Sequence, residues 1–462
     1  MSIHTERSIL PQSVHETLSE HMLADGFDYV LDLDKSQGSY LVDARNGRRY
    51  LDLFTFFASN PVGMNHPRIA NEEFIRKIGR VALHKPSNSD IYTVELAEFL
   101  DTFYRVAVPD HFPYAFFIEG GALAVENALK TAIDWKVRKN IAAGLPETLG
   151  TKVVHFEQAF HGRSGYTMSL TNTDPTKVKY WPKFTDWPRI MNPYAEFPLT
   201  GENLERTVAR EKAALEQLNA AFDRHPHDIA CVILELIQGE GGDNHFRPEF
   251  LAELRRICDE REAMLIADEV QTGIGLTGAM WAHQALGVVP DIIAFGKKTQ
   301  VCGILVGPRV DDVDDNVFHH SSRINSTWGG NLTDMVRFQR VLEIIEEEKL
   351  VDNAREVGTH LLSALESIAA DFPEMISNPR GLGLMCAMTV RDAEMRRDIV
   401  DACFARGVMI LGCGVRSIRF RPPLNITTAQ IDEGIAVIRA VLTAICDDDE
   451  RPEQSVVDVL GE

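Results

Sequence analysis

Between about residues 110 and 310, short apolar runs alternate with segments in which apolar positions recur at helical spacing. Short apolar runs bounded by polar or Gly-rich turns predict buried strands, and the periodic segments predict amphipathic helices. This alternation predicts an α/β fold with a mostly parallel sheet that is covered on both faces. The expected strands cover residues 114–119, 151–156, 229–236, 263–270, 290–296 and 303–307, with the clearest helices over 122–137 and 247–262.

The chain shows neither an internal repeat nor a Gly/Ser-rich or Pro-rich linker between modules. Its 462 residues are too many for one simple core and fit two or three domains. We therefore expect the two chain ends to pack together as a second domain.

The charge balance narrows the range of partners. Lys and Arg number 47 against 68 Asp and Glu, a formal net charge of −21. A surface this acidic repels a phosphate backbone and an anionic membrane, so we expect neither nucleic acid nor membrane as a partner.

The seven cysteines are scattered without C-x-x-C spacing, and the first residues carry charge where a signal peptide needs an apolar core. These features predict a cytoplasmic protein with free thiols.

Ligands of parallel α/β sheets bind at the carboxyl ends of the strands, so the residues after each run matter most. Gly120 and Gly121 follow the first run and open a helix, where free backbone amides could hold an anion. A tight turn without a ligand is the alternative interpretation. Phe160 follows the second run in a Gly-flanked loop, where it could cover a planar ligand or pack into the core.

Two further strand ends carry charge. Asp268 and Glu269 close the 263–270 run, and alternation along a strand sends one of them toward a packed face or the ligand crevice. A buried carboxylate implies a cationic partner, which could equally be a structural ion pair. Lys297 and Lys298 follow the 290–296 run at a place where active sites form, although a solvated lysine pair is the alternative.

Three patterns point elsewhere but are incomplete. The segment 273–278 matches G-x-G-x-x-G, yet it stands several residues beyond its strand and lacks the acidic residue that a dinucleotide site needs. The residues around Lys297 resemble a phosphate loop, but Asp291 stands where its first glycine should be. His283 and the pair His319 and His320 have no partners at metal-ligand spacing, so we expect no metal. A nicotinamide dehydrogenase and a nucleotide hydrolase stay as remote alternatives.

Taken together, an anion cradle, an aromatic ring, a carboxylate and a lysine at strand ends match the needs of pyridoxal 5′-phosphate. Its phosphate needs helix amides, its ring a stacking face, its ring nitrogen a carboxylate, and its aldehyde a lysine for a Schiff base.

The sequence resembles the class III (ω-amino acid) aminotransferases of fold-type I, and most closely their bacterial lysine-type subgroup. The likeness covers nearly the whole chain and includes FFIEGGALAVENALK, AFHGRSGYTMSLTNT, IQGEGGDNHFRPEF, DEVQTGIGLTG, PDIIAFGKKTQVCG, NSTWGGNLTDM and IRFRPPL. DEVQTG followed by PDI-x-x-x-x-K is its most specific part. The resemblance implies a large cofactor-binding domain over residues 67–330 and a small α+β domain built from 1–66 and 331–462.

Several cofactor contacts follow from the resemblance. It places Gly121 and Ala122 at the phosphate, Phe160 on the ring, Asp268 at the ring nitrogen and Gln271 at the ring hydroxyl. Many family members have Ser or Thr at the position of Gly120. Without that hydroxyl, binding of the phosphate depends more on backbone amides.

Two adjacent lysines compete for the cofactor aldehyde. The family spacing selects Lys297, while Lys298 is the runner-up. The resemblance also places Thr327 at the phosphate of the neighbouring subunit, which implies a homodimer with active sites at the interface.

The substrate contacts also follow from the resemblance. Arg419 would grip the α-carboxylate of 2-oxoglutarate through a bidentate ion pair. Glu240 would neutralise Arg419 when a substrate enters by its ω-amine, because an unpaired buried guanidinium is costly. Arg163 would hold the far carboxylate of lysine, with Asn325 as a further substrate-binding residue. A structural ion pair is the alternative for each charged group.

The implied reaction is transfer of the ε-amino group of L-lysine to 2-oxoglutarate. Its products would be L-glutamate and 2-aminoadipate 6-semialdehyde, which cyclises to a piperideine carboxylate. Ornithine or 4-aminobutyrate is the alternative donor within the class. A catalytically silent scaffold on the same fold is the alternative from another class, which the presence of both Lys297 and Asp268 disfavours.

Overall fold

The computed structural model describes residues 9–449, and its central feature is a seven-stranded sheet. The strand order is β3-β11-β10-β9-β6-β4-β5. Strand β11 is antiparallel to both neighbours and the other adjacent pairs are parallel, as the alternation of runs and helices predicted. The strands are β3 (Tyr114–Ile118), β4 (Lys152–Phe156), β5 (Arg189–Ile190), β6 (Ile229–Leu234), β9 (Met264–Asp268), β10 (Ile292–Phe295) and β11 (Cys302–Val306).

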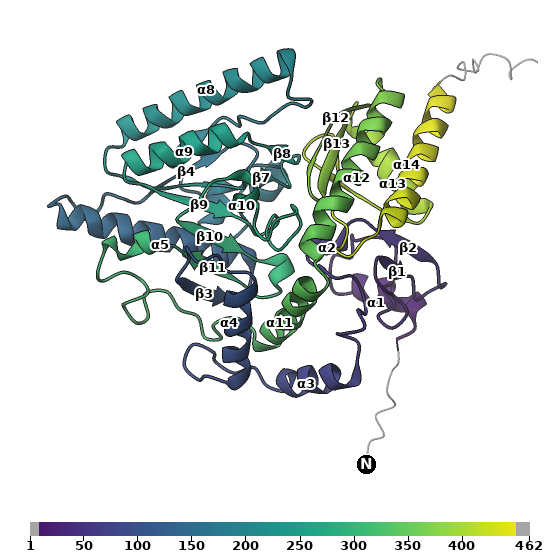
Figure 1. Ribbon diagram of the computed structural model, residues 1–462, viewed down its shortest axis with the longest axis horizontal. Coiled ribbons are helices and arrows are strands. Elements are labelled where there is room, and N and C mark those ends of the chain that lie inside the picture. The colour runs from purple at the N-terminus through teal and green to yellow at the C-terminus, as the bar shows by residue number, and fades with distance from the viewer. Residues whose placement is uncertain (1–8, 450–462) are drawn as a thin grey trace, which may run out of the picture.

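Helices cover both faces of this sheet (Figure 1). Every residue of β6 is buried, because alternate side chains enter two different cores. Val232 and Leu234 pack with α8 (Gly201–Arg224) and α9 (Pro248–Glu260). Cys231 and Ile233 pack on the other face with α5 (Gly121–Ala142).

The two ends of the chain meet beside the large sheet, where Figure 1 shows the C-terminal segment next to the N-terminal one. Strand β14 pairs in parallel with β2, so that Val408 lies opposite Leu51. The three-stranded sheet contains β1 (Tyr40–Val42), β2 (Arg49–Asp52) and β14 (Val408–Met409). A four-stranded sheet contains β12 (Ile376–Leu382), β13 (Met385–Val390), β16 (Ser417–Phe420) and β15 (Leu411–Cys413), and a short ribbon contains β7 (Ile237–Gln238) and β8 (Asn244–His245).

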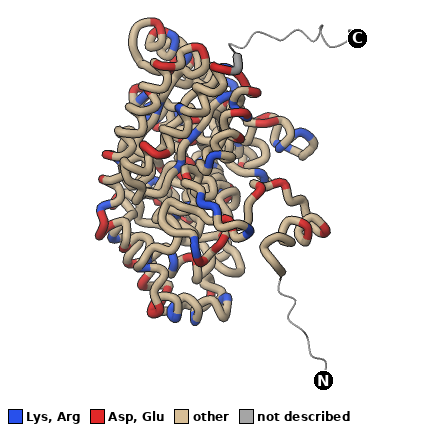
Figure 2. The backbone as a smooth tube through the Cα atoms, turned by 90° about the vertical axis from the view of Figure 1, so that its right-hand side faces the viewer, with Lys and Arg blue, Asp and Glu red and all other residues tan. Residues whose placement is uncertain are grey.

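The remaining helices begin at polar caps in several cases: Asn71, Thr93, Asn331 and Asp392 each accept an amide hydrogen bond from the first turn. These helices are α1 (Val14–Ser19), α2 (Thr55–Ala58), α3 (Glu72–Ala82), α4 (Val94–Val106), α6 (Thr167–Leu170), α7 (Pro175–Val178), α10 (Ala282–Leu286), α11 (Leu332–Glu347), α12 (Leu350–Asp371), α13 (Ala393–Ala405) and α14 (Thr428–Asp449). Within the described residues, none of the helices combines the length and apolarity that crossing a membrane requires. Acidic and basic residues are intermixed along the chain (Figure 2).

Candidate functional site

The candidate site lies where the parallel strands end. Gly120 follows β3, His161 stands in the loop after β4, and Glu235 follows β6 directly. Asp268 is the last residue of β9, and Lys297 comes after β10. Because β9 lies between β6 and β10, the last three of these residues leave neighbouring strands at one edge of the sheet.

The Asp268 carboxylate is fixed by two hydrogen bonds inside the protein. Its Oδ2 lies 2.7 Å from Nδ1 of His161, and its Oδ1 accepts the Val270 amide at 3.1 Å. Glu269 takes the opposite face of the strand, where it pairs with His283 at 3.0 Å and accepts the amide of that residue. The alternation expected for the two acids is therefore observed, and both side chains are buried.

The two adjacent lysines have different surroundings. Lys298 is buried, and its Nζ donates to the carbonyls of Gln271 at 2.6 Å and Ala58 at 3.3 Å. Lys297 instead lines a cavity of about 690 Å³ together with Gly120. Within residues 9–449 its amine makes no hydrogen bond or ion pair, so it is the lysine that is free to react.

Burial shapes the chemistry of that amine. Desolvation, together with the smaller effect of the nearby Arg419 guanidinium, lowers the pKa of Lys297 to about 8. A larger fraction of the amine is therefore neutral near neutral pH than for an exposed lysine, as a nucleophile or general base requires.

The backbone under Lys297 is a tight connection between two hydrogen-bonded strands. Lys297 has a φ of 54°, in the left-handed region that side chains other than glycine rarely adopt. The side-chain Nε2 of Gln300 donates to the Ser59 carbonyl at 2.8 Å, and the backbone amide of Gln300 donates to the Lys297 carbonyl at 2.9 Å. The connection is thus tied to the segment after α2 on one side and to Gln271 through Lys298 on the other.

The start of α5 has no side-chain cap and so matches the anion cradle that the sequence predicts. Gly120 precedes the helix with a φ of 98°, and its first turn has no side-chain cap. The loop after β4 comes close to this turn, since a Cβ on Gly162 would lie 2.5 Å from the Ala122 Cβ. Uncapped amides at the start of a long helix suit a phosphate group.

Glu235 joins two loops of the site. Its Oε1 accepts the Phe160 amide at 2.9 Å, and its Oε2 accepts the Gly239 amide at 3.0 Å. Burial raises the pKa of Glu235 to about 7. This carboxyl group sets the position of Phe160, the expected stacking residue, relative to the loop that carries Glu240.

Arg419 and Glu240 form the expected ion pair. Arg419, on β16, is buried, and its Nη2 lies 3.5 Å from Oε2 of Glu240. Among the described residues, Nε and Nη1 of Arg419 are buried without a hydrogen-bond partner. The other carboxylate oxygen of Glu240 contacts Nζ of Lys177 on α7, so one acid lies between two cations.

A second arginine, Arg421, directly follows β16 and holds Gln271 in place. Arg421 pairs with Asp243 at 2.5 Å, and both side chains are almost completely buried. Its Nε donates to Oε1 of Gln271 at 2.9 Å. The position of Gln271, the residue expected at the ring hydroxyl, is therefore fixed by a buried ion pair.

Arg163 lies outside the cavity that Lys297 lines. It is exposed and lines a cavity of about 640 Å³ with Lys177, Met168 and Trp181. Within the described part of the chain its guanidinium has no ion-pair partner, which leaves it available to an anion from solution.

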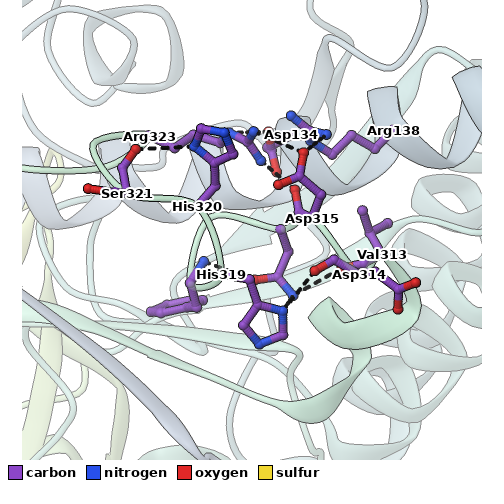
Figure 3. A network of polar contacts seen from close by, with 11 residues as sticks. Asp134, Arg138, Val313, Asp314, Asp315, His319, His320, Ser321 and Arg323 are labelled. Carbon is purple, nitrogen blue, oxygen red and sulfur yellow. Dashed lines mark hydrogen bonds and ion pairs between the residues drawn. The ribbon is translucent and has the colours of Figure 1, made fainter.

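Asn325 and Thr327 are exposed and lie outside the cavity around Lys297. The loop before them is fastened to α5 by a network of ion pairs (Figure 3). Arg323 pairs with Asp315 at 3.3 Å, and Arg138 pairs with Asp315 at 2.6 Å and with Asp134 at 3.0 Å. The network presents this segment outward at a fixed place.

The structure therefore brings together Asp268, Lys297, Phe160, Glu240 and Arg419, and leaves Arg163, Asn325 and Thr327 exposed and outside the Lys297 cavity. The sequence analysis missed four side chains that contact predicted site residues: His161 at Asp268, Glu235 at the Phe160 amide, Lys177 at Glu240 and Arg421 at Gln271. His161 and Arg421 stand inside the motifs FHGR and IRFRPPL, where adjacency to a predicted site residue was the available signal. The uncapped helix start, the held carboxylate and the free lysine fit pyridoxal 5′-phosphate.

Comparison with known proteins gives concordant results. The model of the class-III aminotransferases matches residues 24–442. The chain is 55% identical to the L-lysine-epsilon aminotransferase of Mycobacterium bovis over 95% of this chain and 97% of that one. Identity to the L-lysine-epsilon aminotransferase of Streptomyces clavuligerus is 49%, over 94% of this chain and 95% of that one. The solved structure of the lysine aminotransferase from M. tuberculosis in the internal aldimine form has a TM-score of 0.92 and 55% identity, covering 95% of this chain and 100% of that chain.

Proposed function

We propose that this chain, which belongs to the class III aminotransferases, transfers the ε-amino group of L-lysine to 2-oxoglutarate. The predicted fold-type I architecture and the dependence on pyridoxal 5′-phosphate are those of the family and its solved relative. The lysine donor is supported by the names of the relatives at 49% identity and above. It is favoured over ornithine and 4-aminobutyrate for the same reason.

One observation carries the acceptor assignment. Arg419 is buried close enough to Lys297 to lower the pKa of its amine, and it has two donors unpaired among the described residues and Glu240 as a displaceable partner. A planar carboxylate can take both free donors at once, as the α-carboxylate of 2-oxoglutarate would. A donor that enters by its amine brings no carboxylate to Arg419, and Glu240 then neutralises Arg419.

We assign the remaining roles as follows. Pyridoxal 5′-phosphate, when bound, supplies an aldehyde for amino groups and a ring that withdraws electrons from the substrate carbon. Lys297 holds the cofactor and moves a proton to and from the substrate at its Nζ. Asp268 keeps the ring nitrogen protonated, and Phe160 covers the ring. Gly121 and Ala122 bind the phosphate through their amides.

Gln271 binds the ring hydroxyl from the position that Arg421 gives it. Arg163 binds the α-carboxylate of lysine, assisted by Asn325. Two observations support this assignment: Arg163 is exposed, and it lines the cavity of about 640 Å³ that Lys177 also lines.

We also propose a homodimer in which Thr327 reaches the phosphate of the neighbouring subunit. Thr327 is exposed, and its segment packs on the 87–92 loop, where Ser87 Oγ donates to the Thr327 carbonyl at 2.5 Å. Ile91 and Tyr92 of that loop are 65% and 77% exposed, and Trp328 is 43% exposed. An exposed apolar surface next to Thr327, which lies outside the Lys297 cavity of its own subunit, fits burial against a second copy of the chain.

The domain division at residues 67 and 331 and the cytoplasmic location stay proposals. Pairing of β14 with β2 supports a small domain made from both chain ends, of which residues 1–8 and 450–462 lie outside the described residues. All seven cysteines are free thiols, which suits a reducing compartment.

The first experiment is a visible absorption spectrum of the full chain loaded with the cofactor, before and after addition of L-lysine alone. We expect the cofactor band to bleach with lysine and to return when 2-oxoglutarate is added. A band that responds only to ornithine or 4-aminobutyrate would overturn the donor. Absence of any bound cofactor after reconstitution would overturn the catalytic role.

A further inference from the structure

We infer that Lys177 holds Glu240 when 2-oxoglutarate displaces it from Arg419, and so sets the affinity of the site for its dicarboxylate substrate. This inference rests on the proposed function and adds a positioning residue to it. The unusual feature is a single carboxylate shared by two cations from different parts of the fold.

The geometry divides the two oxygens of Glu240 between different partners. Oε1 makes the short contact to Nζ of Lys177, while Oε2 lies 3.5 Å from Nη2 of Arg419. The longer distance marks the Arg419 contact as the weaker of the two. A substrate carboxylate can therefore take Arg419 while Glu240 keeps its contact with Lys177.

Burial explains why such a second partner is needed. Glu240 is 25% exposed and Lys177 is 26% exposed, whereas the Arg419 side chain is 4% exposed. A carboxylate that loses its cation in such a partly buried place pays a desolvation cost unless another cation is present. Lys177 is already in contact and removes that cost.

Lys177 and Glu240 also line two different cavities. Glu240 lines a cavity of about 560 Å³ with Arg396 and Gly414. Lys177 lines the cavity of about 640 Å³ that Arg163 also lines. Its Nζ lies 5.7 Å from the centre of the Phe160 ring, so it stands next to the expected cofactor-stacking residue.

Charge favours the same interpretation. Lys177, Glu240 and Arg419 together carry one excess positive charge. Binding of one carboxylate at Arg419 neutralises that excess, provided that Glu240 stays paired with Lys177. Removal of Lys177 would leave Glu240 and the substrate carboxylate competing for Arg419 alone, and like charges in this place repel each other.

The test compares Lys177→Met with the wild type in the full chain loaded with cofactor. We expect the KM for 2-oxoglutarate to rise about tenfold, the effect of one lost charge-assisted hydrogen bond, while the KM for L-lysine stays unchanged. Lys177→Arg, which keeps the charge, should restore a value near that of the wild type. Lys179→Met, two residues along the exposed end of α7, is the matched control and should change neither constant.

A second measurement separates action through Glu240 from direct substrate binding. In a Glu240→Ala background, Lys177→Met should add no further change to the KM for 2-oxoglutarate. A rise in the KM for lysine in Lys177→Met would instead make Lys177 a direct ligand of the donor carboxylate, beside Arg163, and would overturn the inference. An unchanged KM for both substrates would also overturn it.

A binding measurement keeps the inference independent of turnover and of the donor. Glutarate, an unreactive five-carbon dicarboxylate, serves as the probe in titration calorimetry. Its Kd should rise in Lys177→Met by about the same factor as the KM for 2-oxoglutarate. A wild type that binds glutarate but does not use lysine would refute the proposed donor alone, whereas an unchanged Kd in Lys177→Met would refute the role of Lys177.

Discussion

The imidazole of His161 lies against the carboxylate of Asp268, with 2.7 Å between Nδ1 and Oδ2. Both side chains are buried, and Nε2 of His161 has no partner among the described residues. The histidine therefore orients Asp268, the acid that we propose for the ring nitrogen of the cofactor, from the loop that follows β4. It acts as a positioning residue, since its own contact is with Asp268.

Replacing His161 tests this relationship. We expect His161→Phe to lower kcat about tenfold to a hundredfold, the cost of one hydrogen bond to a charged group. The absorption band of the bound cofactor should shift as well, because the ring nitrogen loses part of its fixed counter-charge. Steady-state kinetics and a spectrum of the same sample provide both readouts.

His283→Gln is the matched control, because His283 also pairs with a buried carboxylate, at 3.0 Å from Glu269. This variant should lose thermal stability without a change in the cofactor spectrum. Equal spectral effects in the two variants would contradict a specific role for His161.

The two lysines can be separated by trapping. Lys297→Ala should lose cofactor that borohydride reduction fixes to the protein, with kcat reduced by at least about a thousandfold because both the attachment point and the proton carrier are lost. Lys298→Ala should keep the fixed cofactor and lose stability, since two backbone carbonyls lose their donor. Mass spectrometry of tryptic peptides locates the adduct, and an adduct that persists in Lys297→Ala would transfer the role to Lys298.

The lowered pKa of Lys297 predicts how cofactor reloading depends on pH. Only a neutral amine attacks an aldehyde, and with a pKa of about 8 the neutral fraction of Lys297 grows as pH rises through that value. The rate of reloading of the cofactor-free protein should therefore rise with pH and level off about one to two pH units above 8. Stopped-flow absorbance measures this rate, and a rate that keeps rising beyond pH 10 would contradict the lowered value.

Removal of Glu240 should affect the two half-reactions unequally. In Glu240→Ala the Arg419 guanidinium is left without its neutralising partner when lysine occupies the site. We expect the lysine half-reaction to slow by about tenfold to a hundredfold, while the half-reaction with 2-oxoglutarate changes less than about threefold. Single-turnover absorbance measurements resolve the two, and an equal loss in both would argue for a structural ion pair.

The buried pair of Arg421 and Asp243 should be a stability determinant. Asp243→Asn leaves a guanidinium that is 2% exposed without its counter-charge. We expect a loss of about 3 to 5 kcal/mol in the free energy of unfolding, together with weaker cofactor binding as Gln271 shifts. Glu253→Gln, which breaks the exposed 2.9 Å pair with Arg256, should cost less than about 1 kcal/mol. Denaturant titrations compare the two, and a similar cost for both would contradict the prediction.

The sequence pattern predicted the large sheet well, because strands such as β6 and β9 are buried on both faces and therefore read as continuous apolar runs. The same logic located the Asp268–Glu269 and Lys297–Lys298 pairs, since strand ends converge on one edge of a parallel sheet, and the family resemblance then selected Asp268 and Lys297. Both appear where the pattern placed them.

Residues that act through a partner far along the chain escaped the pattern. His161 and Asp268 are 107 positions apart, and Arg421 and Asp243 are 178 positions apart. Such pairs form only where loops that follow different strands come into contact in the folded chain. Hydrophobic periodicity does not predict which loops are in contact. Lys177 stands on a helix of only four residues, α7, whose sequence has too few turns to show a face.

The tight connection beneath Lys297 has a mechanical consequence. Strands β10 and β11 are hydrogen-bonded neighbours, and each has a further strand on its other side, so the chain enters and leaves this connection at fixed points. Lys298 and Gln300 fasten it from two sides, and the left-handed backbone at Lys297 is held in place by them. In the role that we propose for Lys297, the backbone therefore stays in place while the amine moves between cofactor and substrate through its four-carbon side chain. The length of that side chain then sets how far the proposed base can reach.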